Sequence, residues 1–158
     1  MTTSAAPFAD VPVLLRGEAQ PIRGWMDQWS TARLALCFVV VVAGTGAFGA
    51  ALGSWRAPEQ ALYTAIKLPL ILLLTALGNG LLNAMLAPLL GLNLGFRQSL
   101  FAVLLSFTIA AAILGAFSPL LWFLLWNVPP LTAGSPQSVT THSLILLAET
   151  LMIAFAGI

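Results

Sequence analysis

AIKLPLILLLTALGNGLLNAMLAPLLGLNLGFRQSL, residues 65–100, is the stretch that decides the fold. It opens with Lys67 and Pro69, continues without a charge through a glycine-bounded turn, and resumes after Arg97. A helix of about 20 apolar residues crosses the hydrocarbon core of a bilayer and satisfies its own backbone hydrogen bonds there. The stretch therefore predicts a membrane-spanning helix followed by a hairpin.

The composition of the whole chain agrees with this interpretation. Hydrophobic residues make up 59% of the 158 residues and charged residues 7%, whereas an average soluble domain has about 45–50% and about 25%. A chain of this length has too little interior to hide so much apolar surface from water, so we expect lipid to be its solvent. The sequence has no basic patch that could follow a phosphate backbone, which argues against a nucleic-acid partner. Cys37 is the only cysteine, so no intrachain disulfide can form, and we expect it to be a small buried hydrophobe.

Two segments precede the first span. Residues 1–20 contain isolated charges among Pro, Ala and Ser, and predict a flexible N-terminal arm. Residues 21–33 place apolar side chains at helical spacing and predict an amphipathic helix in the head-group layer. Its apolar face consists of Ile22, Trp25, Met26 and Trp29.

The first span is predicted over residues 34–53, at the start of a single transmembrane domain that covers residues 34–158. Gly49 and Gly53 form a GxxxG pattern, which lets another backbone approach closely. We expect a helix-packing face here, and self-association through it is an alternative.

The second span is predicted over residues 62–87. Thr75, Asn79 and Asn83 recur every four residues and so share one face of the helix. Amides in mid-membrane are costly against lipid, so this face is expected to meet protein or water. A neighbouring groove of small residues favours a packing seam, against the third span or a partner, over a hydrated passage. The groove consists of Ala76, Gly80 and Ala84.

The third span is predicted over residues 99–126, with Gly115 available for close packing and a tilt or a kink at Pro119. Residues 127–143 predict a loop outside the bilayer, because they contain three prolines and no charge. The last segment, residues 144–158, would be only about 22 Å long as a helix, too short to span. We therefore expect a partial fourth span and a chain that continues beyond Ile158.

One part of the chain has a family resemblance. The run YTAIKLPLILLLTALGNGLLNAML, followed by FRQSL and AFSPLLWF, resembles the bacterial Yip-type integral membrane proteins over residues 63–123. The resemblance implies four or five spans and, from eukaryotic relatives, membrane trafficking through GTPase-linked partners. It implies no catalytic residue.

Few residues could carry chemistry. The sequence lacks HExxH, GxSxG, CxxC and a phosphate-binding loop, so we expect no enzyme activity, no cofactor and no metal. His142 and Glu149 fall on one helix face, but seven residues separate their Cα atoms by about 10 Å, too far to share a metal. Glu149 is still a functional-site hypothesis, since ionisable groups inside spans are rare. Thr75, Asn79 and Asn83 could complete a polar pocket for it.

These observations predict an all-α polytopic membrane protein with three full transmembrane helices, a partial fourth and an N-terminal interfacial helix. The expected function is that of a non-catalytic scaffold or accessory subunit, whose partners are the bilayer and other membrane subunits or further copies of itself. The alternatives are a conduit for a small solute, ion or proton, and a Yip-type organising protein.

The distribution of positive charges predicts a cytoplasmic N-terminus. Together with the resemblance to bacterial membrane proteins, this gives the bacterial inner membrane as the expected location. Four arginines fall on the N-terminal side and two basic residues on the other. The first group is Arg16, Arg23, Arg33 and Arg97, and the second is Arg56 and Lys67.

Overall fold

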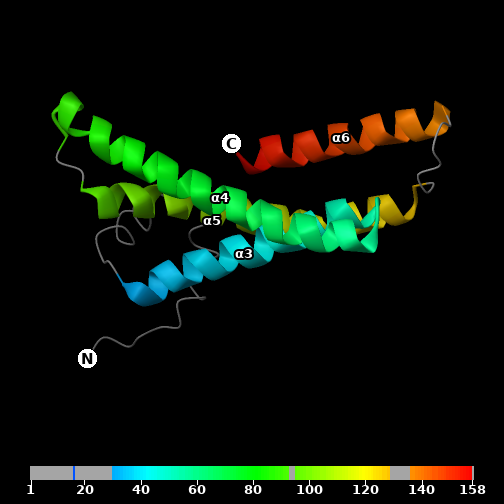
Figure 1. The fold of residues 1–158 in the computed structure, drawn as a ribbon, viewed down its shortest axis with the longest axis horizontal. Helices are drawn as coiled ribbons and strands as arrows, with labels where there is room; N and C mark the ends of the chain where they lie inside the picture. The colour runs from blue at the N-terminus through cyan, green and yellow to red at the C-terminus, as the bar shows by residue number, and fades with distance from the viewer. Residues whose placement is uncertain (1–15, 17–29, 93–94, 129–135, 158) are drawn as a thin grey trace. The chain divides into compact units, whose positions relative to one another are not determined.

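Helices make up all the regular secondary structure in the described part of the chain. The structure is a computed structural model and describes residues 16, 30–92, 95–128 and 136–157. Its α-helices are α3 (Thr31–Ser54), α4 (Pro58–Leu86), α5 (Phe96–Trp126) and α6 (Pro136–Ala156), and a short 3-10 helix, η2 (Pro88–Leu90), follows α4 (Figure 1). All four α-helices are long and apolar enough to cross a membrane. The predicted all-α, membrane-spanning fold is confirmed.

The N-terminal predictions fall largely on residues that the structure does not describe. The arm, apart from Arg16, and residues 21–29 of the amphipathic helix lie outside the described residues. From Thr31 onward the chain belongs to α3. Ser30 caps this helix, because its Oγ accepts a hydrogen bond from the backbone N–H of Ala32 at 3.3 Å.

The turns on either side of α4 are short. Pro58 opens α4 with its φ already suited to a first helical position, so the helix begins before residue 62. At its other end Gly91 has a left-handed φ of 72°, and its N–H donates to the carbonyl of Pro88. Glycine adopts this conformation without strain, so η2 and Gly91 end the helix before α5 begins.

The second half of the predicted loop over residues 127–143 is wrong, because α6 begins at Pro136 and has 21 residues. Its polar residues are compatible with a helix when their hydroxyls bond within it. Ser143 Oγ donates to the carbonyl of Val139 at 3.0 Å. The apolar window Val139–Ala156 has 18 residues, or about 27 Å of helix, whereas the sequence pattern indicated 15 residues from Leu144.

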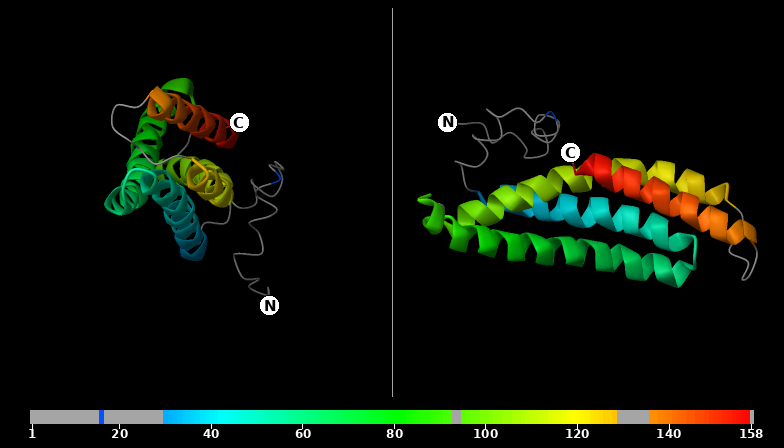
Figure 2. Two further views of the ribbon diagram at one scale, coloured as in Figure 1. Left: turned by 90° about the vertical axis from the view of Figure 1, so that its right-hand side faces the viewer. Right: turned by 90° about the horizontal axis from the view of Figure 1, so that it is seen from above.

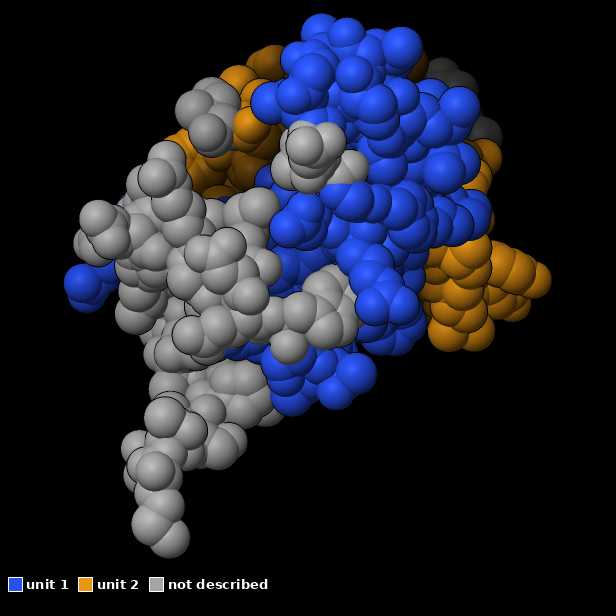
Figure 3. Space-filling model, turned by 90° about the vertical axis from the view of Figure 1, so that its left-hand side faces the viewer, with its two compact units in different colours: residues 1–40, 72–109 blue, residues 41–71, 110–158 orange. Residues whose placement is uncertain are grey.

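The chain divides into two compact units (Figure 3). Each of α3, α4 and α5 contributes one part to each unit. Unit 1 comprises residues 1–40 and 72–109, and unit 2 comprises residues 41–71 and 110–158. The buried residues of unit 1 include Phe101 and Thr108 of α5. Cys37 is fully buried there, as expected of a small hydrophobe.

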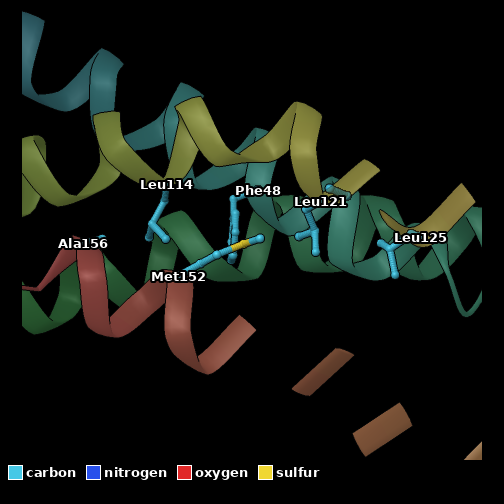
Figure 4. Packing of buried hydrophobic residues seen from close by; sticks show 7 residues of the cluster. Phe48, Leu114, Leu121, Leu125, Met152 and Ala156 are labelled. Carbon is cyan, nitrogen blue, oxygen red and sulfur yellow. The ribbon is translucent and has the colours of Figure 1, made fainter. Parts of the chain in front are cut away.

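Unit 2 has a hydrophobic core to which α3, α5 and α6 contribute side chains (Figure 4). Phe117 of α5 and Phe155 of α6 meet edge to face, with ring centroids 5.7 Å apart. The end of α3, the start of α4 and the start of α6 lie at the same end of this unit (Figure 2). The core cluster consists of Phe48, Ala51, Leu114, Leu121, Leu125, Met152 and Ala156.

Candidate functional site

Glycines of α3 allow two close helix contacts in unit 2. Toward α5, a Cβ added at Gly44 would overlap the backbone carbonyl of Ala111, and one added at Gly115 would lie 2.9 Å from the Cα of Gly44. Toward α4, a Cβ at Gly49 would lie 2.6 Å from the carbonyl oxygen of Thr64. These distances are too short for any side chain, so the backbones touch at these points.

The predicted packing glycines therefore lie at contacts within the chain. Gly53 approaches the first turn of α4, where an added Cβ would lie 2.5 Å from the Cα of Ala61. The GxxxG face of Gly49 and Gly53 is covered by α4, so the structure leaves it no room to act as a face for self-association. Gly115 lies against α3 at the crossing with Gly44.

In unit 1, Gly80 of α4 faces α5. A Cβ added at Gly80 would lie 2.9 Å from the Cα of Leu100. Ala76 is buried and Ala84 is half-buried. Two members of the groove predicted beside the amide stripe, Ala76 and Gly80, are thus buried within the chain.

The amide stripe itself, Thr75, Asn79 and Asn83, is exposed on α4. None of its three side chains makes a hydrogen bond within the described residues. Other polar side chains in the helices do so by donating to the carbonyl four residues earlier, which is a common way to satisfy a hydroxyl in a membrane helix. Asn127, the residue after α5, also does this with its Nδ2, 2.8 Å from the carbonyl oxygen of Phe123. The hydroxyls that do so are those of Thr45, Thr64, Ser106, Thr108, Ser118, Ser143 and Thr150.

Unit 2 contains a cleft of about 720 Å³. The turn between α3 and α4 contributes Trp55 and Arg56 to it, and α6 contributes His142 and Glu149. This volume is in the usual range of about 300–1,000 Å³ for small-molecule sites. We call it the unit 2 cleft; its other lining residues are Leu52, Gly53, Gln60, Thr64, Val139, Ile145 and Leu146.

An aromatic stack joins α6 to the α3–α4 turn beside the cleft. The ring centroids of Trp55 and His142 lie 5.8 Å apart, and their planes are inclined by only 12°. The indole Nε1 of Trp55 is buried and has no hydrogen-bond partner within the described residues. The stack fixes His142 at the end of the cleft that contains the turn.

The structure groups the predicted polar residues differently from the sequence pattern. His142 and Glu149 both line the unit 2 cleft, but Thr75, Asn79 and Asn83 do not and belong to unit 1. Sequence reasoning missed Trp55 and Arg56 as partners of these α6 residues. The available signal was a tryptophan next to an arginine in a turn between two spans, which is typical of the membrane interface.

No protein-family model, curated protein or solved structure matches the chain. The amide stripe of α4 and the unit 2 cleft are the features of the described residues that bear on function.

Proposed function

We propose that the protein is a non-catalytic subunit of a larger membrane assembly and that α4 contacts the partner through the amide stripe. The observation that supports this most strongly is that three polar side chains on one face of an apolar helix are exposed and have no hydrogen-bond partner among the residues that the structure describes.

The energetics favour a protein cover for this face. An amide without a partner costs several kcal/mol in an apolar medium. A hydrogen bond between membrane helices contributes about 0.6 to 2 kcal/mol, so the cost of exposure to lipid is larger than the gain from pairing. Covering the stripe removes that cost, and the assembly is therefore favoured even if each new bond is weak.

The stripe also indicates the chemistry of the partner. An amide both donates and accepts, so the partner helix must present groups of either kind, and a second copy of α4 would suffice. Gly78 lies beside the stripe, and a Cβ added there would meet nothing within 4 Å. The partner backbone therefore has room to approach α4 closely.

Replacing both Asn79 and Asn83 by leucine tests the proposal. We expect normal insertion into the membrane and association at least five- to tenfold weaker. Two interhelical bonds of about 0.6 kcal/mol each are lost, and the cost of leaving two amides against lipid no longer favours assembly. To measure association, the purified complex is diluted in mild detergent, and the fraction that stays assembled is determined from the mass of the particles.

Thr150→Leu is the matched control, since it also replaces an exposed polar side chain by leucine on a spanning helix. The Thr150 hydroxyl already donates to the carbonyl of Leu146 within α6, so its replacement removes no interhelical hydrogen bond. Association should therefore not change. Equal association of the double variant and the control would contradict the proposal.

The alternative function is a conduit, and the location of Glu149 in a cleft favours it. If the amide stripe lined a hydrated passage, the double leucine variant would assemble normally and lose flux, and cysteines at positions 79 and 83 would react with water-soluble thiol reagents.

A Yip-type role in membrane organisation, inferred from the resemblance of residues 63–123, belongs to the same non-catalytic class as the proposed subunit.

A further inference from the structure

We propose that the unit 2 cleft binds one glycerophospholipid, whose phosphate contacts Arg56 beside the Trp55–His142 stack and whose acyl chains lie on the apolar wall. This site is separate from the amide stripe and does not depend on the proposed subunit function.

The charge of Arg56 is available for a ligand. Its side chain is exposed, lines the cleft, and makes no ion pair with an acidic residue of the described chain. A guanidinium group presents parallel N–H donors that match two oxygens of a phosphate. Arg56 therefore offers a pair of donors for one phosphate group.

The position of Arg56 matches the depth of lipid head groups. It lies in the short turn between α3 and α4, two helices that can each cross a membrane. The start of α6 is at the same end of unit 2 (Figure 2). Tryptophan is enriched at the membrane–water interface, and the charged end of an arginine is stable there, so the Trp55–Arg56 end of the cleft is expected to lie in this layer.

The rest of the cleft is lined largely by apolar side chains, which suit the acyl chains of a lipid. Its apolar wall is formed by Leu52 of α3 and by three residues of α6, and a free phosphate ion would gain nothing from these side chains. An acyl chain, in contrast, would pack against them over the length of the cleft. The three residues of α6 are Val139, Ile145 and Leu146.

Glu149 distinguishes this proposal from a cation site. It is seven residues beyond His142, about 10 Å further along α6, and forms no ion pair with Arg56. A lipid phosphate at Arg56 would thus be two helical turns from the carboxyl group. A cationic ligand, in contrast, would require Glu149 and not Arg56.

The test is a titration of the purified protein, in mild detergent, with phosphatidylglycerol, with the bound lipid counted by native mass spectrometry. We expect one lipid per chain and an affinity at least tenfold lower for Arg56→Gln. Arg97→Gln is the matched control, since Arg97 is also exposed near a helix terminus but belongs to unit 1. The affinity of this variant for the lipid should stay within twofold of the wild type. Diacylglycerol with the same chains should bind at least tenfold more weakly, and inorganic phosphate should not displace the lipid.

Three results would overturn the proposal. Equal affinities of the two arginine variants would show that the lipid binds without Arg56. Displacement by inorganic phosphate would show a site for a free anion. Loss of binding in Glu149→Gln with normal binding in Arg56→Gln would show that the carboxyl group holds the ligand.

Discussion

Replacing Gly44 by leucine is expected to prevent α3 from packing on α5 in unit 2. Even the Cβ of the new side chain would overlap the carbonyl oxygen of Ala111, and the glycine across the contact is Gly115. The obstacle is backbone on the α5 side, which cannot rotate away as a flexible side chain can. We expect a loss of about 3 kcal/mol or more in the free energy of unfolding, at the upper end of the usual range for overpacking.

Unfolding by sodium dodecyl sulfate, followed by circular dichroism, measures this loss. Gly46→Ala is the control, because its Cβ would lie 3.4 Å from the carbonyl oxygen of Ala65, which is close to ordinary contact. Alanine also favours a helix by about 1 kcal/mol over glycine, so the control should be neutral or more stable. Equal stability of Gly44→Leu and the control would show that α3 and α5 do not cross at Gly44.

Replacing Gly53 by valine should open the hairpin of α3 and α4. A Cβ there would overlap the carbonyl oxygen of Gln60 and lie 2.5 Å from the Cα of Ala61. The chain leaves only residues 55–57 between the two helices, so α4 has little freedom to move away. We expect a destabilisation of about 3 kcal/mol, with α3 and α4 separating in the variant.

The measurement is the distance between spin labels at Ser54 and Gln60, together with the unfolding curve. Gly78→Val serves as control, since the same side chain is introduced in a helix where a Cβ meets nothing within 4 Å. It shares the modest helix penalty of a β-branched residue without the clash. A Gly53→Val protein with the wild-type label distance and stability would contradict the close contact.

The spans could be predicted from the sequence because long uncharged runs have few alternatives in a chain this apolar. The start of α6 could not, since Thr and Ser in residues 136–143 also suit a loop. Their hydroxyls bond within the helix, as that of Ser143 does, and this local pairing is invisible to composition.

The sequence indicated which small residues would pack closely, but not which helix each of them would contact. Gly49 and Gly53 were recognisable as a close-approach pair, but their partner α4 depends on tertiary contacts. Gly44 was missed because it lies outside that pair, although its neighbours in sequence are also small. The unit 2 cleft was missed for a similar reason, since it joins residues about 90 positions apart, such as Trp55 and His142.

The amide stripe was evident from spacing, but its orientation was not. Asn79 and Gly80 are neighbours in sequence and differ by about 100° around the helix. Either side could have faced α5. The structure places Gly80 against Leu100 and leaves Asn79 exposed.

The most direct test of the subunit proposal is photocrosslinking from position 79 in native membranes. A benzophenone amino acid replaces Asn79, and a second variant carries it at the exposed Leu74, about 140° away on α4. The proposal predicts that position 79 forms a covalent adduct with another protein chain, seen as a discrete species of higher mass, and that position 74 reacts with lipid. Adducts with lipid alone from position 79 would contradict it.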